Sequence, residues 1–270
     1  MGADWELPPP LRTDIAHSAR IYDYFIGGKD NFPVDREAAE QVLTLRPSLA
    51  LAAQANRRFM CRAVDHVAAQ GVRQFLDLGT GIPTSPNTHE VAQAALPDAR
   101  VVYVDNDPMV LVHARALLVS APQGRTAYID ADIREPESVL QDPALRQVLD
   151  LDQPICLMLV AVLHFVADSE DPYGLVAKLL GACPSGSRLI LTHGTEDFAD
   201  EAGAKALEAY RASGVNLHLR THDEVLRFFD GLELDDPGLQ LVNRWRPDTD
   251  VDRRARPEDI TWYGAVARKP

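Results

Sequence analysis

Cysteine, positive charge and long apolar runs are all scarce in this sequence. Its 270 residues include three cysteines, Cys61, Cys156 and Cys183, which are odd in number, widely spaced and set in apolar stretches. Such a pattern suits reduced thiols in a protein core better than a disulfide framework or a cysteine-based zinc site. A reducing compartment, the cytoplasm, is therefore the expected location.

Positive charge is outweighed by negative charge, since 27 Lys and Arg face 40 Asp and Glu and the formal net charge is −13. The average electrostatic field of such a surface repels phosphate backbones and anionic lipids. Nucleic acid is therefore not expected as the main partner, although a local basic cleft on an acidic body can bind one. A small-molecule partner fits this surface best.

Apolar runs stay short throughout the chain. The longest, residues 155–163, falls far below the ~18 to 20 residues that span a bilayer, so it predicts a buried strand and no membrane anchor. The composition, with 46% hydrophobic and 25% charged residues, is that of a globular chain with a packed core.

From about residue 72 onward, short β-branched runs alternate with longer amphipathic stretches. This alternation predicts parallel strands joined by helical crossovers, and hence an α/β fold. Capping boxes mark helix starts at Asn87 and Thr221, and Asp107 stands before a proline suited to a first helical turn. We expect the last two strands to pair as an antiparallel hairpin and to complete a seven-stranded sheet. The expected strands are residues 74–78, 101–104, 127–129, 155–160, 188–192, 239–242 and 262–267.

Helical signals dominate before residue 72. Apolar residues recur at helical spacing over residues 35–45 and 49–70, which predicts an N-terminal helical extension rather than a second strand-and-helix unit. The first ten residues are acidic and rich in proline, and they predict a tail. Residues 20–32 mix aromatic and charged side chains with a Gly-Gly pair, and no simple periodicity explains them.

A glycine turn follows the first expected strand. Residues 75–81 read Phe-Leu-Asp-Leu-Gly-Thr-Gly, and glycines at that place let the backbone approach a ligand closely. This is the first half of a nucleotide-binding fingerprint, and a tight turn that binds nothing is the alternative interpretation. The usual third glycine is missing, because Ile82 and Pro83 follow Gly81. That departure counts against a dinucleotide pyrophosphate, which needs a helix N-terminus close by.

Carboxylates stand at the ends of the next two expected strands. Asp105 ends the second strand, where a carboxylate can accept hydrogen bonds from both ribose hydroxyls of an adenosine cofactor, whereas Asp107 is better placed to cap a helix. After the third strand, Asp132 is favoured over Asp130 as an acceptor for the adenine amino group, while Ile133 packs on the ring. A solvated acidic loop is the alternative. Open α/β sheets bind ligands at the carboxyl ends of their strands, which favours a binding site here.

A histidine follows the fourth expected strand. His164 comes to the same edge of the sheet, where an imidazole can act as a base or orient a substrate, although a lone histidine is more often structural. His193, at the end of the fifth strand, is a weaker candidate. Three further histidines show no metal-ligand spacing, so we expect no metal site; they are His17, His66 and His89.

Four strings of sequence are long and specific: residues 19–31 (ARIYDYFIGGKDN), 55–59 (ANRRF), 77–84 (DLGTGIPT) and 102–108 (VYVDNDP). With them the chain resembles the actinobacterial S-adenosyl methyltransferases, a family long catalogued as a domain of unknown function. The resemblance extends over nearly the whole length. It implies a Rossmann-like class I methyltransferase fold that binds S-adenosylmethionine and releases S-adenosylhomocysteine. Within that fold, residues 1–71 are expected to form a tail and a helical cap or lid, and residues 72–270 the cofactor-binding domain.

The resemblance also implies which residues hold the cofactor. From the sheet they are Asp77, Gly79, Thr80, Gly81, Asp105, Asn106, Asp132 and Ile133. Residues 20–32 are expected either to close over the cofactor or simply to cap the fold. In the first case Tyr22 or Phe32 lies near the sulfonium, because a sulfonium is attracted to aromatic faces as other cations are. The contacts expected from this segment, to the cofactor or to a substrate, are Arg20, Tyr22, Lys29, Asp30 and Asn31.

Two functions from different classes stay open. The first is a methyltransferase that acts on a small-molecule acceptor, with Tyr22, Asp23 or His164 as the base. The second is a protein that senses S-adenosylmethionine or S-adenosylhomocysteine without doing chemistry, because no unmistakable catalytic motif is present. A nicotinamide oxidoreductase on a related sheet finds no support in the sequence.

Overall fold

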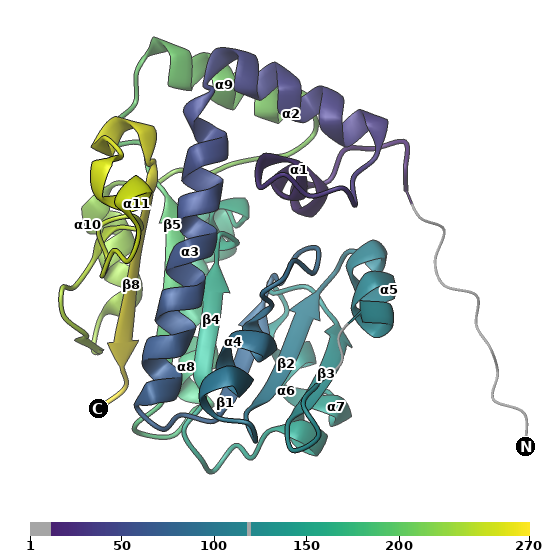
Figure 1. The fold of residues 1–270 in the computed structure, drawn as a ribbon, viewed down its shortest axis with the longest axis vertical. Coiled ribbons are helices and arrows are strands. Elements are labelled where there is room, and N and C mark those ends of the chain that lie inside the picture. The colour runs from purple at the N-terminus through teal and green to yellow at the C-terminus, as the bar shows by residue number, and fades with distance from the viewer. Residues whose placement is uncertain (1–11, 118–119) are drawn as a thin grey trace, which may run out of the picture.

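A twisted sheet runs through the centre of the computed structural model, which describes residues 12–117 and 120–270 (Figure 1). Within these ranges the strand order is β3-β2-β1-β4-β5-β8-β6, and β7 pairs with β8. The first five strands are parallel, and each is present where it was predicted, with ends that differ by at most two residues. Their bounds are β1 Gln74–Leu78, β2 Arg100–Asp105, β3 Arg125–Asp130, β4 Cys156–Val160 and β5 Arg188–Gly194.

The C-terminal part of the chain adds antiparallel strands beside β5. β8 (Trp262–Arg268) runs antiparallel to β5, and β7 (Gln240–Leu241) pairs with β8, so the predicted hairpin is confirmed. A short strand, β6 (Glu233–Leu234), also pairs with β8. The described part of the sheet therefore has eight strands rather than the predicted seven. Sequence patterning missed β6 because both of its residues are exposed and show no alternation.

Helices cover both faces of the sheet. Leu76 and Leu78 of β1 pack in one core, whereas Phe75 packs on the opposite face, because successive side chains of a strand point to opposite sides. The core with the leucines is covered by α6 Pro136–Gln141, α7 Pro143–Val148, α8 Pro172–Gly181 and α10 His222–Leu226. The opposite face is covered by α3 Ser48–Ala69 and α4 Thr88–Ala95, while α5 Pro108–Leu117 packs against β2 and β3.

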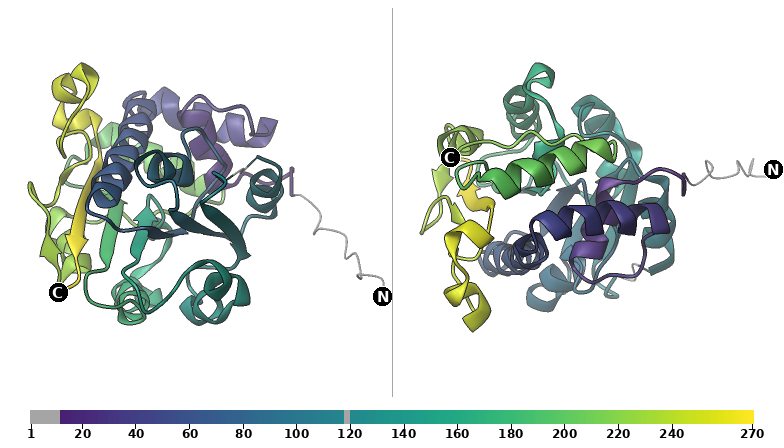
Figure 2. Two further views of the ribbon diagram at one scale, coloured as in Figure 1. Left: turned by 60° about the horizontal axis from the view of Figure 1, so that its bottom comes forward. Right: turned by 90° about the horizontal axis from the view of Figure 1, so that it is seen from above.

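Three helices form a roof above the carboxyl ends of the parallel strands. α2 (Pro33–Leu45) lies beside α9 (Glu201–Ala212), and α1 (Ser18–Phe25) lies between them and the sheet (Figures 1 and 2). Their apolar side chains share one core. The helices predicted over residues 35–45 and 49–70 are present as α2 and α3, although α3 packs on the sheet and only α2 belongs to the roof.

The predicted helix starts are confirmed. Capping boxes are formed at Asn87 with Glu90 and at Thr221 with Glu224. A short helix, α11 (Asp250–Arg254), lies in the connection between β7 and β8. In the described chain, no helix combines the length and the apolar character needed to cross a membrane. The tail predicted for the first ten residues lies outside the described residues.

Candidate functional site

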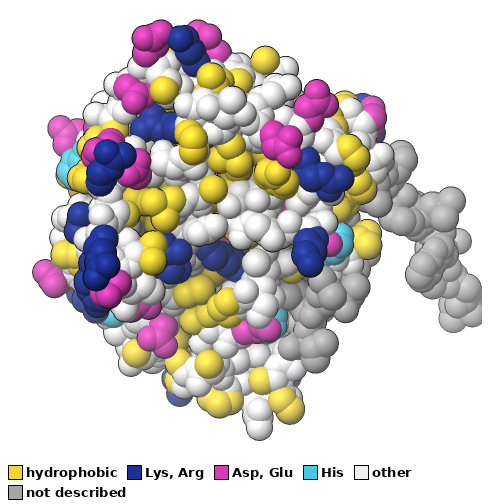
Figure 3. Space-filling view, turned by 45° about the horizontal axis from the view of Figure 1, so that its top comes forward, with side chains coloured by type: hydrophobic (Ala, Val, Ile, Leu, Met, Phe, Trp, Pro, Cys, Tyr) yellow, Lys and Arg dark blue, Asp and Glu magenta, His cyan; other side chains and the backbone are white. Residues whose placement is uncertain are grey.

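A cavity of about 780 Å³ lies at the carboxyl ends of the parallel strands, beneath the roof helices. This volume is in the range of small-molecule and cofactor sites. Figure 3 shows this side of the molecule, where apolar side chains gather near the centre beside a few Lys or Arg side chains, and other charged side chains lie farther out. The structure brings eleven of the predicted residues to its walls: Tyr22, Asp23, Asp77, Gly79, Thr80, Gly81, Asp105, Asn106, Asp132, Ile133 and His164.

The glycine turn after β1 forms part of the cavity wall. Gly79 and Gly81 both adopt left-handed backbone conformations, with φ of +70° and +69°. The amide of Gly79 donates to the carbonyl of Val104 at 2.8 Å, and a Cβ added at Gly79 would lie 2.3 Å from Cγ2 of Val162. The turn is therefore held between β2 and the chain that follows β4, and it has no room for a side chain at Gly79.

The carboxylate of Asp105 is fixed by two backbone amides. Its Oδ2 accepts from the amide of Gly81 at 2.8 Å, and its Oδ1 accepts from the amide of Asp107 at 2.9 Å. Each carboxylate oxygen can accept a further hydrogen bond, so the side chain is held in place and can still bind two hydroxyls. Burial raises the pKa of Asp105 above its ordinary value.

Asp107 has the capping role that the sequence indicated. Its Oδ1 accepts from the amide of Met109 at 2.9 Å, in the first turn of α5. Its Oδ2 lies 3.1 Å from Nδ1 of His17, which precedes α1. Asp107 therefore ties α5 to the start of the roof and does not face the cavity.

Asp77, in β1, is a second buried carboxylate at the cavity. Its Oδ2 accepts from the hydroxyl of Thr88 at 2.7 Å, and burial raises the pKa of Asp77 to about 6. The hydroxyl of Thr80 donates to the backbone carbonyl of Asp77 at 3.0 Å, which closes the glycine turn. A buried carboxylate favours a cationic ligand, because the cation offsets the cost of keeping the carboxylate charged.

Asp132 and Ile133 line the end of the cavity beyond β3. Asn106 donates from Nδ2 to Oδ2 of Asp132 at 3.0 Å, and Arg134 forms an ion pair with Asp132 at 3.0 Å. Ile133 is buried and packs into the neighbouring core. Asp130 is exposed and does not line the cavity, so of the two carboxylates only Asp132 is placed to meet a ligand there.

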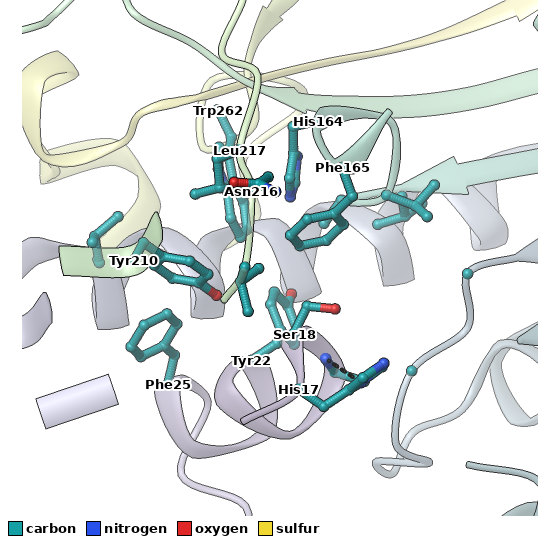
Figure 4. A pocket seen from close by; sticks show the side chains of 18 of the residues that line it. His17, Ser18, Tyr22, Phe25, His164, Phe165, Tyr210, Asn216, Leu217 and Trp262 are labelled. Carbon is teal, nitrogen blue, oxygen red and sulfur yellow. Dashed lines mark hydrogen bonds between the residues drawn. The ribbon is translucent and has the colours of Figure 1, made fainter. Parts of the chain in front are cut away.

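Aromatic side chains line the opposite end of the cavity (Figure 4). Tyr22 stacks on Trp262 with 5.9 Å between ring centroids, and His164 stacks on Trp262 at 6.0 Å. The side chains come from α1, from the short helix η1 (Leu163–Phe165), from α9 and the segment after it, and from β8. We call this space the aromatic chamber and define it by Tyr22, Phe25, His164, Phe165, Tyr210, Leu217 and Trp262.

His164 reaches the aromatic chamber as an uncharged imidazole. Burial lowers its pKa well below the ordinary value, and His193 and Arg220 lower it further. His193 itself is held behind the chamber, because its Nε2 accepts from Arg220 at 2.6 Å and its Nδ1 donates to the carbonyl of Gly194 at 2.7 Å. Nδ1 of His164 is buried and has no hydrogen-bond partner in the described chain. Figure 4 shows the ring pointing into the chamber, so a ligand meets its outer edge, which carries Nε2.

Tyr22 offers the chamber its ring rather than its hydroxyl. The hydroxyl donates to the carbonyl of Ala53 at 3.1 Å and accepts from Nδ2 of Asn56 at 3.1 Å. Burial also raises the pKa of Tyr22. A hydroxyl that is already bonded and whose pKa is raised is poorly suited to act as a base.

Asp23 organises the turn between α1 and α2. Its Oδ2 accepts from the amide of Asp30 at 3.0 Å and from Nδ2 of Asn31 at 2.7 Å. A Cβ added at Gly28 would lie 1.9 Å from Oδ1 of Asp23, so this close approach explains the second glycine of the Gly-Gly pair. Asp23 is therefore engaged within the turn, and burial raises its pKa.

Arg20 is also a framework residue. It is buried and forms an ion pair with the buried Asp35 of α2 at 3.2 Å, and its guanidinium lies over the ring of Phe32 at 5.3 Å. Five residues of this segment that the sequence placed near a ligand do not line the cavity, and we leave them out of the proposed site: Arg20, Lys29, Asp30, Asn31 and Phe32.

Histidines and cysteines elsewhere are engaged in the framework. His66 lies 2.8 Å from Asp235, and His89 contacts the hydroxyl of Tyr103 at 2.8 Å. All three cysteines are unpaired, as the sequence predicted. Among residues 12–117 and 120–270, no group of three or more His, Cys, Asp or Glu side chains is arranged to hold a metal ion.

The sheet order, the antiparallel C-terminal strands and the cavity at the strand ends define a Rossmann-like class I methyltransferase fold. A family model described as S-adenosyl methyltransferase matches residues 5–270, and the chain belongs to this family. The family predicted from the sequence is thus confirmed. The protein is an S-adenosylmethionine-dependent methyltransferase, and S-adenosylmethionine is its cofactor.

Two solved structures are similar over nearly the whole length. A DUF574 family protein from Streptomyces avermitilis is 51% identical, with a TM-score of 0.93 and coverage of 96% of this chain and 99% of that one. A candidate methyltransferase from Thermobifida fusca is 40% identical, with a TM-score of 0.88 and coverage of 99% of both chains. The plantazolicin methyltransferase BpumL, crystallised with S-adenosylhomocysteine, shares the fold at 13% identity, a TM-score of 0.52 and coverage of 93% and 95%. No curated protein matches the chain.

Proposed function

We propose that this methyltransferase acts on a small-molecule acceptor held in the aromatic chamber. One observation carries the proposal: the cavity that begins at the buried carboxylates of β1 and β2 continues into the aromatic chamber near β4 and β8. The cofactor supplies an activated methyl group, and the protein holds the acceptor in line with it and excludes water. The formal charge of −13 disfavours a nucleic-acid acceptor.

The order of the strands sets the direction in which we expect the cofactor to lie. Asp132 and Ile133, beyond β3, suit the adenine ring. Asp105, at the end of β2, suits the ribose hydroxyls, and Asp77 in β1 suits the ammonium group of the methionine part. Because β4 is the next strand after β1, this order brings the sulfonium beside the aromatic chamber, where the ring of Tyr22 lies.

The glycine turn fits this cofactor better than it fits NAD. A dinucleotide pyrophosphate binds where a helix N-terminus follows closely on the glycines. Here Ile82 and Pro83 follow Gly81, and α4 begins only at Thr88. S-adenosylmethionine carries no phosphate and does not need that helix N-terminus.

Cofactor affinity is expected to fall as the pH is lowered through the pKa of Asp77. That pKa is raised to about 6, so the carboxylate is charged at neutral pH and takes up a proton as the pH falls. A protonated Asp77 loses its attraction for the cofactor's ammonium group, and the affinity at pH ~5 should be about tenfold weaker than at neutral pH. Isothermal titration calorimetry across this range measures the effect. Asp77→Asn should abolish it, and a wild-type affinity that stays constant down to pH ~5 would contradict this role.

The proposed function is tested by calorimetry and by turnover. We expect the wild type to bind S-adenosylmethionine and S-adenosylhomocysteine in the micromolar range and to bind NAD weakly or not at all. An acceptor screen that measures release of S-adenosylhomocysteine then reports methyl transfer. Preferential binding of NAD would refute the cofactor assignment.

The same screen bears on the alternative of a sensor without catalytic activity. The family model and two of the similar structures describe methyltransferases, and they give that alternative no support. Tight cofactor binding with no turnover of any acceptor would restore it. The cytoplasmic location stays a prediction.

A further inference from the structure

The aromatic chamber offers flat, apolar surfaces to an acceptor. Tyr22 lies nearly parallel to Trp262, with an interplanar angle of 11°, and His164 lies at 21° to the same ring. Phe165 packs against His164 with 4.4 Å between centroids. Figure 4 shows Phe25 and Tyr210 across the chamber from these rings. Faces of this kind stack favourably on a planar aromatic molecule.

The charged side chains around the cavity have partners already or face solvent. Arg46 forms an ion pair with Asp200 at 3.2 Å. Arg57 donates to two backbone carbonyls, its buried Nε has no hydrogen-bond partner in the described chain, and its charge acts on Asp77, whose pKa it lowers. Asp23 accepts hydrogen bonds from the turn after α1, and Glu196 is exposed. The charge of Arg57 acts on the carboxylate of Asp77, at the cofactor end of the cavity. A charged acceptor would therefore give up water in the chamber without gaining a free counter-ion, and an unpaired buried charge is costly.

A hydrogen-bond acceptor is nevertheless available in the chamber. Nδ1 of His164 is buried, and the outer edge of the ring points into the space (Figure 4). The nearest ionisable neighbours behind the ring, His193 and Arg220, disfavour a positive charge on it, and Asp168 pairs with Arg220 at 2.6 Å rather than with His164. With its proton on Nδ1, the uncharged ring presents the lone pair of Nε2 to a ligand.

We propose that the methyl acceptor is an uncharged, planar aromatic compound with a hydroxyl group, and that His164 accepts the proton of that hydroxyl. This inference rests on the proposed function. The hydroxyl oxygen forms a bond to the methyl carbon while the bond between that carbon and the sulfonium sulfur breaks, which leaves S-adenosylhomocysteine. His193 and Arg220 disfavour a protonated ring, but the hydroxyl proton passes to Nε2 of His164 as the sulfonium loses its positive charge, so the net charge of the site does not change. The proton then passes to water.

Acceptor binding is tested with three naphthalenes that differ in one substituent. Naphthol is neutral and carries the hydroxyl, naphthoate is an anion, and aminomethylnaphthalene is a cation at neutral pH. Each is titrated by calorimetry into the full chain saturated with S-adenosylhomocysteine. We expect naphthol to bind at least about tenfold more tightly than either charged compound. All three share the naphthalene ring, but only naphthol brings no unpaired charge into the chamber.

Equal or tighter binding of naphthoate or aminomethylnaphthalene, or no binding of naphthol, would overturn the proposed acceptor class. The proposed function is judged separately, by whether S-adenosylhomocysteine itself binds. A chain that binds S-adenosylhomocysteine but prefers a charged naphthalene refutes only the present inference.

The role of His164 is tested by His164→Gln, with naphthol as acceptor and S-adenosylhomocysteine release as the readout. Glutamine can still hydrogen-bond a hydroxyl but cannot take its proton, so kcat should fall about 100-fold while KM changes little. The control is His222→Gln, which alters a histidine at the start of α10 that does not line the cavity and should leave the rate unchanged. Retained binding of S-adenosylhomocysteine shows that His164→Gln is folded. An unchanged kcat in His164→Gln, or wild-type binding of naphthol without turnover, would overturn the role of His164 in this step.

Discussion

Replacement of Asp105 by alanine is expected to weaken the binding of S-adenosylmethionine by about 100-fold or more. In the wild type, the amides of Gly81 and Asp107 fix both carboxylate oxygens at 2.8 and 2.9 Å, so the side chain is positioned before the ligand arrives. Hydrogen bonds from ribose hydroxyls to a charged carboxylate contribute about 1.5–3 kcal/mol each, and the loss of two such bonds corresponds to at least this change in affinity. Isothermal titration calorimetry measures it.

Asp130 supplies a matched control for this experiment. It stands opposite Asp105 in the register between β2 and β3, at the same edge of the sheet, but it is exposed and does not line the cavity. Asp130→Ala should therefore leave the affinity unchanged. Equal losses in the two variants would mean that general charge, and not the held carboxylate, binds the cofactor. An unchanged affinity in Asp105→Ala would show that Asp105 does not bind the ribose hydroxyls.

Gly79→Ala is expected to destabilise the fold by about 3 kcal/mol, because the left-handed backbone and the steric overlap each cost about 1–3 kcal/mol. The backbone has φ of +70°, and the new Cβ would lie 2.3 Å from Cγ2 and 2.8 Å from Cβ of Val162. Thermal denaturation should show Tm lowered by roughly 6 to 12 °C. Because Val162 lies between β4 and η1, its displacement should also disturb the cavity wall.

Two further variants separate backbone strain from overlap. Gly81 has a similar φ of +69°, but a Cβ there would meet only Ala19, at an ordinary 3.9 Å. Gly81→Ala should therefore cost about 1 kcal/mol, the price of the backbone conformation alone. The double variant Gly79→Ala with Val162→Ala should recover part of the lost stability. Equal Tm values for Gly79→Ala and Gly81→Ala would show that contact with Val162 contributes nothing.

The fold could be predicted from the sequence because its signals are local. Each parallel strand is a short run that contains apolar residues, and the residues that begin several helices are capping residues at their usual spacing. β6 could not be predicted, since two exposed residues carry no pattern and pair only because β8 is already in place.

The cofactor end of the site was predictable for a related reason. Parallel strands bring their carboxyl ends to one edge, so the glycine turn, Asp105 and Asp132 were placed together by strand order, whereas Asp77 was added by the family resemblance. The sequence did not show how Asp105 is held, because one of its two partners is the backbone amide of Gly81, in the turn after another strand.

The aromatic chamber as a whole could not be predicted from the sequence. Phe165, Tyr210 and Trp262 stand in none of the quoted motifs, and Phe25 lies in the string of residues 19–31 without a predicted role. Only the packing of the roof on the sheet brings these four residues together.

Residues 20–32 carry charged and amide side chains that were predicted to bind a ligand, and the structure shows the partners that several of them have within the chain. Asn31 and the amide of Asp30 donate to Asp23, and Arg20 forms an ion pair with Asp35, so buried polar groups of this segment are paired within the protein.

A crystal structure of the chain with S-adenosylhomocysteine would test the central claim most directly. We predict that the ribose hydroxyls contact Asp105, that the adenine lies beside Asp132 and Ile133, and that the sulfur faces the aromatic chamber near Tyr22. A nucleoside bound in the aromatic chamber, or bound away from Asp105, would contradict both the cofactor placement and the proposed acceptor site.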